Sequence, residues 1–338
     1  MKDDFLGTWI RRFLLEHMVH ERNLAYNTQR SYRDTLRLLL PYLASLARRR
    51  IDQLRIEDLS ATRIRAFLQN LEEKRECGAA TRNQRLAAIR SLSRFIALRD
   101  PSNLPWCQEI SSIQFKRTAR PLIAYLEQDE MDALLSSPNM TTMQGQRDHA
   151  VLLFMYNTGA RADETAHVCI ADLHLGTTAS RDSSCVLIHG KGNRTRQCPL
   201  WASTVKELRS LIADRSASER VFLNRCGQPL TRFGIHALVA RSAAKAVAVQ
   251  PSLASKRVSP HTIRHTTATH LLRAGVDINT IRAWLGHVCL STTNIYAEVD
   301  LEMKTKALAT CEIEDNTTAG PKKPWRNDKT LMEFLGTL

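Results

Sequence analysis

Apolar residues recur at helical spacing through the first hundred residues of the chain. The first stripe runs from Phe5 to Leu14, with apolar side chains three and four positions apart. Pro41 is expected to kink or end the second helix, because proline lacks the amide hydrogen that continues a helix. The pattern predicts four amphipathic helices that form a bundle, over residues 5–14, 28–40, 61–71 and 82–96, with Asn27-Thr28, Ser60 and Thr81 as candidate caps.

The later part of the chain changes to strand-like patterning and back. The apolar run over residues 151–156 is typical of a buried helix segment, which Gly159 is expected to end. Residues 184–189 and 194–200 flank a glycine-rich turn and predict a β-hairpin. Helical spacing resumes over residues 203–212, 232–246, 260–274 and 278–285. The predicted fold class is therefore mainly α with a small β-sheet.

The segment between the two parts, residues 106–121, contains serines and a basic run without a clear period, which indicates a linker. A length of 338 residues suits two domains. We expect a helical bundle over residues 1–105, an α+β domain over 122–310 and a tail over 311–338. Apolar residues on one face of the tail predict a short helix, at Leu331, Phe334, Leu335 and Leu338.

The excess of basic residues indicates what kind of partner the protein binds. Lys and Arg number 48 against 34 Asp and Glu, a formal net charge of +14, which favours a polyanionic partner such as nucleic acid. Residues 1–120 hold 23 of these bases and 13 of these acids, so the excess is concentrated there. For any single arginine, an ordinary solvated helix face is the commoner explanation. The candidates for contacting a DNA backbone are Arg82, Arg85, Arg90, Arg94, Lys116 and Arg117.

Composition also excludes several classes of protein. No apolar run approaches the roughly 18 to 20 residues of a membrane span, and Asp3 and Asp4 argue against a secretory signal, so we expect an intracellular protein. The eight cysteines include no C-x-x-C pair, which predicts free thiols rather than a zinc ribbon. The chain has no P-loop and no acidic cluster with metal-ligand spacing, so neither ATP nor a metal ion is expected as cofactor.

Four short segments of the second domain carry the candidate chemistry. They are T-G-A-R-A-D-E over residues 158–164, G-K-G-N over 190–193, P-H-T-I-R-H over 260–265, and L-G-H over 285–287 followed nine residues later by Tyr296. In this order and spacing they resemble the catalytic motifs of the tyrosine recombinase (phage integrase) family, which includes the Xer resolvases and many integrases of mobile elements. The helical residues 1–105 also resemble that family's core-binding (SAM-like) domain, in the motifs N-T-x3-Y and T-x4-L that begin at Asn27 and Thr81.

Cutting a DNA strand without a metal requires a nucleophile, an acid for the leaving oxygen and fixed positive charge around the phosphate. Arg161 and Arg264 suit the charge, because a guanidinium donates two parallel hydrogen bonds to phosphate oxygens. His261 lies three residues before Arg264 and can face the same target, where it could accept a proton. The resemblance implies the remaining roles: Lys191 as general acid to the 5′ oxygen, His287 as hydrogen-bond donor to a non-bridging oxygen, Tyr296 as nucleophile, and Glu164 as an accessory acid that orients a clamp residue.

Each of these residues also has a simpler explanation. Tyr296 could be a packed aromatic residue, Lys191 a solvated turn residue, and Arg161 half of a helix ion pair with Glu164. His261 and His265 could suggest zinc, but an arginine lies between them and the glutamate of H-E-x-x-H is missing. All of these simpler explanations would have to hold at four segments that also occur in the order typical of one family. The catalytic interpretation is therefore favoured.

The resemblance implies a site-specific DNA recombinase or integrase that cuts and rejoins duplex DNA through a 3′-phosphotyrosine, without metal or ATP. Two alternatives stay open: a type IB topoisomerase, against which the core-binding-like bundle argues, and a catalytically silent DNA-binding regulator of the same fold. Two departures from the family pattern are mild, since Ile263 and Ala297-Glu298 replace its usual leucine and histidine and remove no catalytic group.

The family further implies partners and a setting. Double-stranded DNA is the expected substrate, and a homotetramer the expected assembly, with a second recombinase or accessory protein as a further partner. The tail over residues 311–338 would dock on a neighbouring protomer, with packing on its own domain or fraying as the simpler alternative. A bacterial mobile element or plasmid is the expected source, with integration, excision, transposition or resolution as the outcome, in the cytoplasm and on the nucleoid when bound to DNA.

Overall fold

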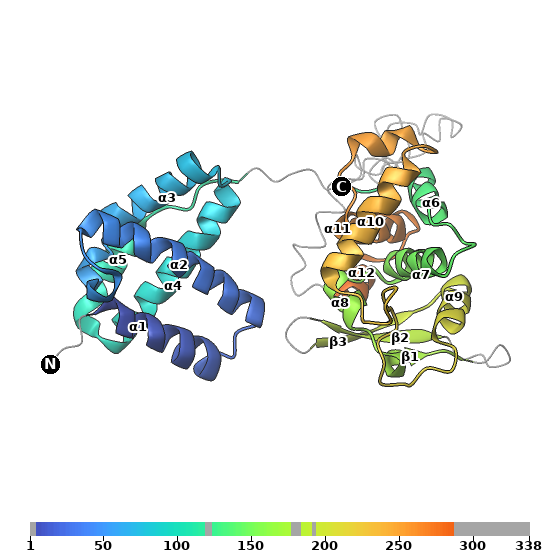
Figure 1. The fold of residues 1–338 in the computed structure, drawn as a ribbon, viewed down its shortest axis with the longest axis horizontal. Coiled ribbons are helices and arrows are strands. Elements are labelled where there is room, and N and C mark those ends of the chain that lie inside the picture. The colour runs from blue at the N-terminus through green and yellow to red at the C-terminus, as the bar shows by residue number, and fades with distance from the viewer. Residues whose placement is uncertain (1–4, 119–123, 177–183, 191–193, 287–338) are drawn as a thin grey trace, which may run out of the picture. The chain divides into compact units, whose positions relative to one another are not determined.

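The computed structural model describes residues 5–118, 124–176, 184–190 and 194–286 (Figure 1). The chain divides into two compact units, Met1–Pro121 and Leu122–Leu338. No helix in these ranges is both long enough and apolar enough to span a bilayer.

The first unit consists of packed helices (Figure 1), and their apolar stripes meet in one core. Its largest fully buried side chains are Phe13, Phe67 and Phe95. The four predicted helices are present. The elements are α1 (Leu6–Arg12), which continues as a π-helical stretch over Phe13–Glu21, α2 (Tyr26–Ala47), α3 (Ala61–Arg75), α4 (Ala79–Arg99) and α5 (Leu104–Ser112), with short 3-10 turns at Ile51–Gln53, Ile56–Asp58 and Pro101–Asn103.

The ends of these helices partly follow the sequence prediction. Ser60 caps α3, and its Oγ accepts a hydrogen bond from the Arg63 amide at 3.3 Å. Pro41 was expected to kink or end this helix, and it does not end it, because α2 continues through Pro41 to Ala47. Pro41 lies on the exposed side of α2, while Leu39 and Leu43 are fully buried on the other side. Burial of this stripe therefore outweighs the backbone hydrogen bond that proline cannot make.

Helix α5 occupies residues that composition assigned in part to a linker. Ile110 is fully buried in the core of the first unit, and the Trp106 Nε1 donates a hydrogen bond to the Leu59 carbonyl at 2.8 Å. The serines and prolines of this segment favoured a linker in the sequence analysis, but the segment forms a short helix that is held by the contacts of Ile110 and Trp106. Helix α4 likewise starts at Ala79, two residues before the expected cap Thr81.

The second unit places helices against a small antiparallel sheet at one end (Figure 1). Its described strands lie in the order β1-β2-β3, and the predicted hairpin is β2 and β3. The helices predicted in this part of the chain are present. The elements are α6 (Gln128–Ser136), α7 (Met143–Thr158), α8 (Ala162–His167), β1 (Leu173–His174), β2 (Cys185–Gly190), β3 (Arg194–Pro199), α9 (Ala202–Ile212), α10 (Arg232–Ala246), α11 (Pro260–Arg273) and α12 (Ile278–Leu285), with 3-10 turns at Ile170–Asp172 and Pro251–Ser255.

Helix α7 is the centre of this unit. Five consecutive residues, 151–155, are buried, so the helix is covered on every side. It ends at Gly159, whose backbone is left-handed with φ of 61°. A Cβ at this position would also lie 2.5 Å from the Leu285 Cδ2. Glycine is therefore required both by the backbone conformation and by the close approach of α12.

Candidate active site

The first motif lies where α7 ends and α8 begins. Arg161 is the N-cap of α8, and its amide and its Nη1 donate to the two carboxylate oxygens of Glu164, at 2.9 and 2.6 Å. The Glu164 side chain is 6% exposed, whereas that of Arg161 is 36% exposed. The buried carboxylate therefore anchors a guanidinium that is still open to a ligand.

A residue that the sequence analysis missed completes this cluster. Arg196 lies on β3 with its side chain 9% exposed. Its Nη2 donates to the Glu164 Oε2 at 2.7 Å, and its Nε donates to the Trp284 carbonyl at 2.8 Å. A signal was available, because strand alternation places residue 196 on the same face as the buried Cys198. A charged residue on a buried strand face needs a partner.

Glu164 is an anion in this setting. Burial by itself would raise the pKa of the Glu164 carboxyl. The hydrogen bond and charge of Arg196, together with the amide and charge of Arg161, outweigh burial and lower that pKa. The carboxylate thus stays ionised at neutral pH, and it offsets part of the charge of the two arginines.

The third motif lies on the first turn of α11, where Ser259 accepts a hydrogen bond from the Thr262 amide as its cap. Arg264 is 3% exposed, and its Nη1 and Nη2 donate to the carbonyls of Gly159 and Leu285, both at 2.6 Å. These two bonds orient the guanidinium between the end of α7 and the end of α12. A phosphate contact by Arg264 would have to be made alongside them.

Two histidines share the first turns of α11 with Arg264. Partial burial lowers the pKa of His261, and the charges of Arg264, His236 and Arg161 lower it further. Burial, His261 and Arg264 lower the pKa of His265 to about 4. Both imidazoles are therefore neutral at pH 7, and the exposed His261 can accept a proton.

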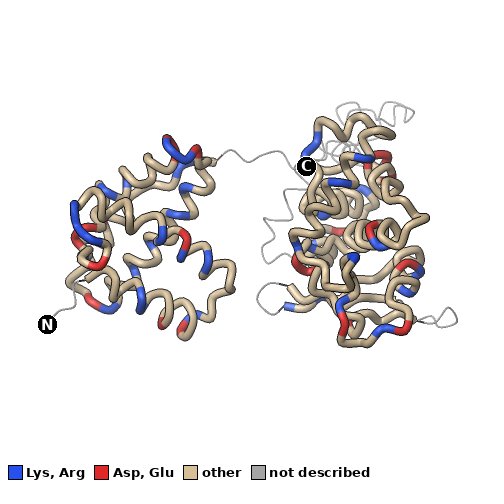
Figure 2. Tube along the Cα trace, viewed as in Figure 1, with Lys and Arg blue, Asp and Glu red and all other residues tan. Residues whose placement is uncertain are grey.

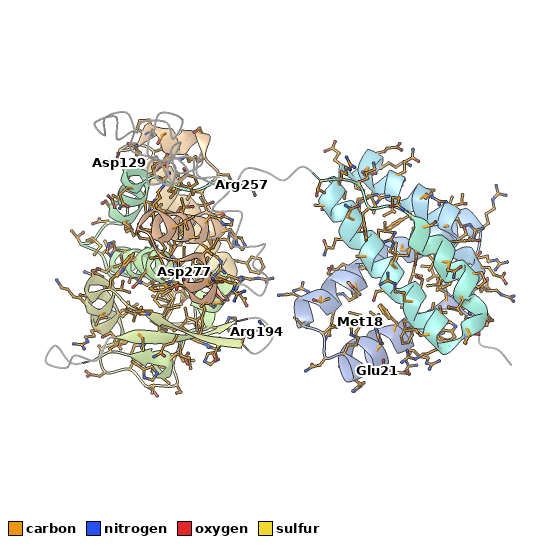
Figure 3. The ribbon with its side chains drawn as sticks, turned by 180° about the vertical axis from the view of Figure 1, so that it is seen from behind. Met18, Glu21, Asp129, Arg194, Arg257 and Asp277 are labelled. Carbon is orange, nitrogen blue, oxygen red and sulfur yellow. The ribbon has the colours of Figure 1, made fainter. Side chains whose placement is uncertain are left out.

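The fourth motif begins at the end of α12. Asp277 caps the start of this helix (Figure 3), and Gly286 ends it in the left-handed conformation, with φ of 68°. A Cβ at Gly286 would lie 3.2 Å from the Arg196 Cδ. A Cβ at Gly190, where β2 ends, would lie 3.4 Å from the Glu164 Oε1. All four motif segments therefore reach the cluster formed by Arg161, Glu164, Arg196 and Arg264, which we call the arginine cluster.

Three predicted catalytic residues, Lys191, His287 and Tyr296, lie outside the described residues. Lys191 directly follows Gly190, and His287 directly follows Gly286, so each is next in sequence to a residue at the arginine cluster. The tail over residues 311–338 also lies outside the described part.

The arginines of α4 differ in their surroundings. Arg82 is 7% exposed, and its Nη1 donates to the Gln114 carbonyl at 2.9 Å. Arg90 is half-buried, donates to the carbonyls of Ser111 and Ile113, and lies over the Phe115 ring at 4.4 Å. The expected outward position was therefore wrong for these two residues, because the segment after α5 covers that side of α4.

The other candidate DNA contacts face solvent to a greater degree. Lys and Arg positions are spread along the helices of the first unit (Figure 2). Arg94 and Arg117 are exposed, and Arg85 is half-buried. Lys116 is exposed but forms an ion pair with Glu72 at 2.8 Å.

The described residues include no group of three or more His, Cys, Asp or Glu side chains placed to hold a metal ion. His261, Arg264 and His265 lie on the same two turns of α11. Within the same residues the thiols of Cys77, Cys107, Cys169, Cys185, Cys198 and Cys226 are free.

Comparison with known proteins gives two family matches. The profile of the phage integrase family matches residues 124–303, and the profile of the phage integrase N-terminal SAM-like domain matches residues 10–100. Among curated proteins, the chain is 35% identical over 335 residues to y4rC of Sinorhizobium fredii, named as an integrase/recombinase, with 98% of each chain covered. It is 32% identical over 301 residues to the tyrosine recombinase XerC of Pelobacter propionicus, with 87% of this chain and 91% of that protein covered.

Solved structures show the same fold at lower identity. The XerH site-specific recombinase bound to palindromic difH substrate, in a post-cleavage complex, has a TM-score of 0.63 at 21% identity and covers 86% of this chain and 82% of that chain. The Tn1549 transposon integrase in complex with transposon right end DNA has a TM-score of 0.65 at 17% identity, with 89% and 98% covered. These likenesses confirm the predicted fold class.

Proposed function

The chain belongs to the phage integrase family of tyrosine recombinases and is a site-specific DNA recombinase, and we propose that Arg161, Lys191, His261, Arg264, His287 and Tyr296 carry its reaction. The observation that carries this proposal is the arginine cluster. It brings the guanidinium groups of Arg161 and Arg264 to the place where the segments ending in Gly190 and Gly286 meet.

The proposed reaction is a phosphoryl transfer. The Tyr296 Oη attacks the phosphorus, a P–O bond to tyrosine forms, and the P–O5′ bond breaks. The phenol proton passes to His261, which is neutral at pH 7, and Lys191 donates a proton to the departing 5′ oxygen. Arg161 and Arg264 balance the charge that develops on the phosphate oxygens, because fixed cations stabilise the transition state more than the ground state. The same steps in reverse rejoin the strand.

Duplex DNA is the proposed substrate. The Tn1549 integrase was solved in complex with transposon right end DNA and XerH bound to its difH substrate, and a net charge of +14 suits a polyanion here. We assign DNA binding to a core-binding domain over residues 1–105 and catalysis to residues 122–310. Of the six candidate basic residues, Arg94, Lys116 and Arg117 are exposed, and Lys116 forms an ion pair with Glu72, so Arg94 and Arg117 are the proposed phosphate contacts.

The assembly and setting are proposed from the family. Four protomers would act on two DNA sites, with the tail 311–338 docked on a neighbouring protomer and with a second recombinase or accessory protein as further partner. The setting would be a bacterial mobile element, with the protein in the cytoplasm and on the nucleoid when bound to DNA.

A covalent adduct tests this function. The purified chain is incubated with nicked duplexes of randomised sequence, in which the short strand released by cleavage diffuses away and rejoining is prevented. Protein-linked DNA is then isolated under denaturing conditions and sequenced. Wild type is expected to yield adducts at a common sequence with EDTA present, and Tyr296→Phe to yield none. Adducts that persist in Tyr296→Phe would overturn the assignment of the nucleophile. On closed circles that carry two copies of the selected site, recombined products rather than relaxed circles are expected.

A further inference from the structure

We propose that Arg196 is a positioning residue for strand cleavage, because one guanidinium holds both the acid that orients Arg161 and the end of the helix that leads to His287. This inference rests on the proposed function. It concerns a side chain that does not belong to the six proposed catalytic residues and that comes from a strand between the second and third motifs.

The contacts of Arg196 connect two sides of the site. On one side its Nη2 donates to the Glu164 Oε2 at 2.7 Å, and Glu164 in turn accepts from the Arg161 Nη1 at 2.6 Å. On the other side its Nε donates to the Trp284 carbonyl at 2.8 Å, two residues before α12 ends. Gly286 then passes so close to the Arg196 side chain that it has no room for a Cβ without a shift. A displacement of Arg196 would therefore move Arg161 and the start of the fourth motif together.

Only an arginine at position 196 can bond the Glu164 carboxylate and the Trp284 carbonyl at the same time. Nε and Nη2 lie on one edge of the planar guanidinium, so their N–H groups point in parallel and reach two acceptors. A lysine at this position keeps the charge beside Glu164, but its single nitrogen cannot reproduce the fork. Arg264 supplies the matching bond to the neighbouring Leu285 carbonyl. Two guanidinium groups from β3 and α11 thus fix consecutive carbonyls at the end of α12.

A role in stability alone is the alternative, and the chain offers a matched control for it. Glu130 is also a buried carboxylate of the second unit, and the Lys256 Nζ pairs with its Oε2 at 2.6 Å. The Ser252 Oγ bonds the other oxygen at 2.6 Å. All three residues lie outside the four motif segments. Removing Lys256 therefore removes a comparable buried ion pair without touching the arginine cluster.

The test compares Arg196→Lys, Arg196→Met and Lys256→Met in the full chain, on the DNA site selected by the adduct experiment. Two quantities are measured: the dissociation constant for that DNA, by fluorescence anisotropy, and the single-turnover rate of adduct formation at saturating enzyme. Arg196→Met is expected to lower the rate about 100-fold, because a misplacement of about 1 Å costs roughly that much, while the dissociation constant changes less than about 3-fold. Arg196→Lys should recover about a tenth of the wild-type rate. Lys256→Met should lower the thermal midpoint and leave the rate within about 3-fold of wild type.

The outcomes separate the possible failures. An unchanged rate in Arg196→Lys, or equal losses of rate in Arg196→Met and Lys256→Met, would overturn the positioning role while Tyr296→Phe still abolishes the adduct. If Tyr296→Phe retains the adduct, the proposed function fails instead. Should Arg196→Met not fold, the double variant with Glu164→Gln, which removes the unpaired buried charge, takes its place. Its rate should fall below that of Glu164→Gln alone, because the bond to the Trp284 carbonyl is lost as well, and equal rates would overturn the link to α12.

Discussion

Removing the Glu164 carboxylate should loosen three elements of the second unit together. The carboxylate accepts hydrogen bonds from the Arg161 amide, the Arg161 Nη1 and the Arg196 Nη2. In Glu164→Ala the Arg196 guanidinium stays buried, with the Trp284 carbonyl as its remaining acceptor among these contacts. Breaking a buried ion pair in this way costs about 3 to 5 kcal/mol. Arg161 can turn to solvent, so we expect the low end, about 3 kcal/mol, which is roughly a hundredfold in an equilibrium constant.

Hydrogen exchange by mass spectrometry on the full chain measures this effect element by element. Peptides that cover α8, β3 and α12 should exchange about 100-fold faster in Glu164→Ala under conditions where exchange reports the opening equilibrium. Peptides of α4, in the other unit, should not change. Glu164→Gln keeps an acceptor oxygen and loses only the charge, so about a tenfold effect is expected. If α12 is protected as in wild type in Glu164→Ala, the coupling through Arg196 does not exist.

Three further results are expected. First, the pKa of His265 is about 4 in the folded protein against an ordinary value of 6.5. Between pH 4 and 6.5 the unfolded chain therefore binds one proton more at this residue than the folded chain does. The stability due to neutral His265 is complete above pH 6.5 and is lost as the pH falls toward 4. The loss is about 2 kcal/mol after allowance for partial exposure. From pH 7.5 to 5 the free energy of unfolding, measured in urea, should fall further in wild type than in His265→Gln, by roughly half of this amount or more. Second, Arg94→Ala should reduce the salt dependence of DNA binding by about one released ion, whereas Arg82→Ala should lower the thermal midpoint with no change of salt slope. Third, the cleavage defect of Lys191→Ala should largely disappear on DNA with a bridging 5′ sulfur, because a thiolate leaves without an acid. A defect of equal size on both substrates would exclude the general-acid role.

The elements of the fold could be predicted well where the pattern of neighbouring residues determines them. Periodic apolar positions predict most helices of both units, though not α5, α6 or α8, and the hairpin follows from its glycine-rich turn. The wrong predictions arise where contacts with residues far away in the sequence determine the local structure. Pro41 stays helical because its apolar neighbours are buried by other helices. Arg82 is covered by a segment about thirty residues further along the chain, at Gln114, which no pattern within α4 shows.

The site shows the same division. Arg161, His261 and Arg264 could be named from motifs of a few residues, whose order resembles a known family. Arg196 was missed because R-T-R-Q resembles an ordinary exposed strand, and its one local signal is the buried Cys198 two residues later on the same face. The antiparallel register, which pairs Arg196 with the buried Ile188, is what turns its side chain inward.

The end of α12 has one more consequence, for mutational scanning. Its two arginine bonds end on peptide oxygens, of Trp284 and Leu285, which every amino acid possesses. Replacing either of these residues by alanine removes apolar bulk but leaves the acceptor in place. A scan that credits each position with what its own side chain does will therefore assign these two bonds to Arg196 and Arg264 alone. Sequence variation at 285 will be limited by volume, whereas Trp284→Ala also loses the hydrogen bond from the indole Nε1 to the Asn157 carbonyl.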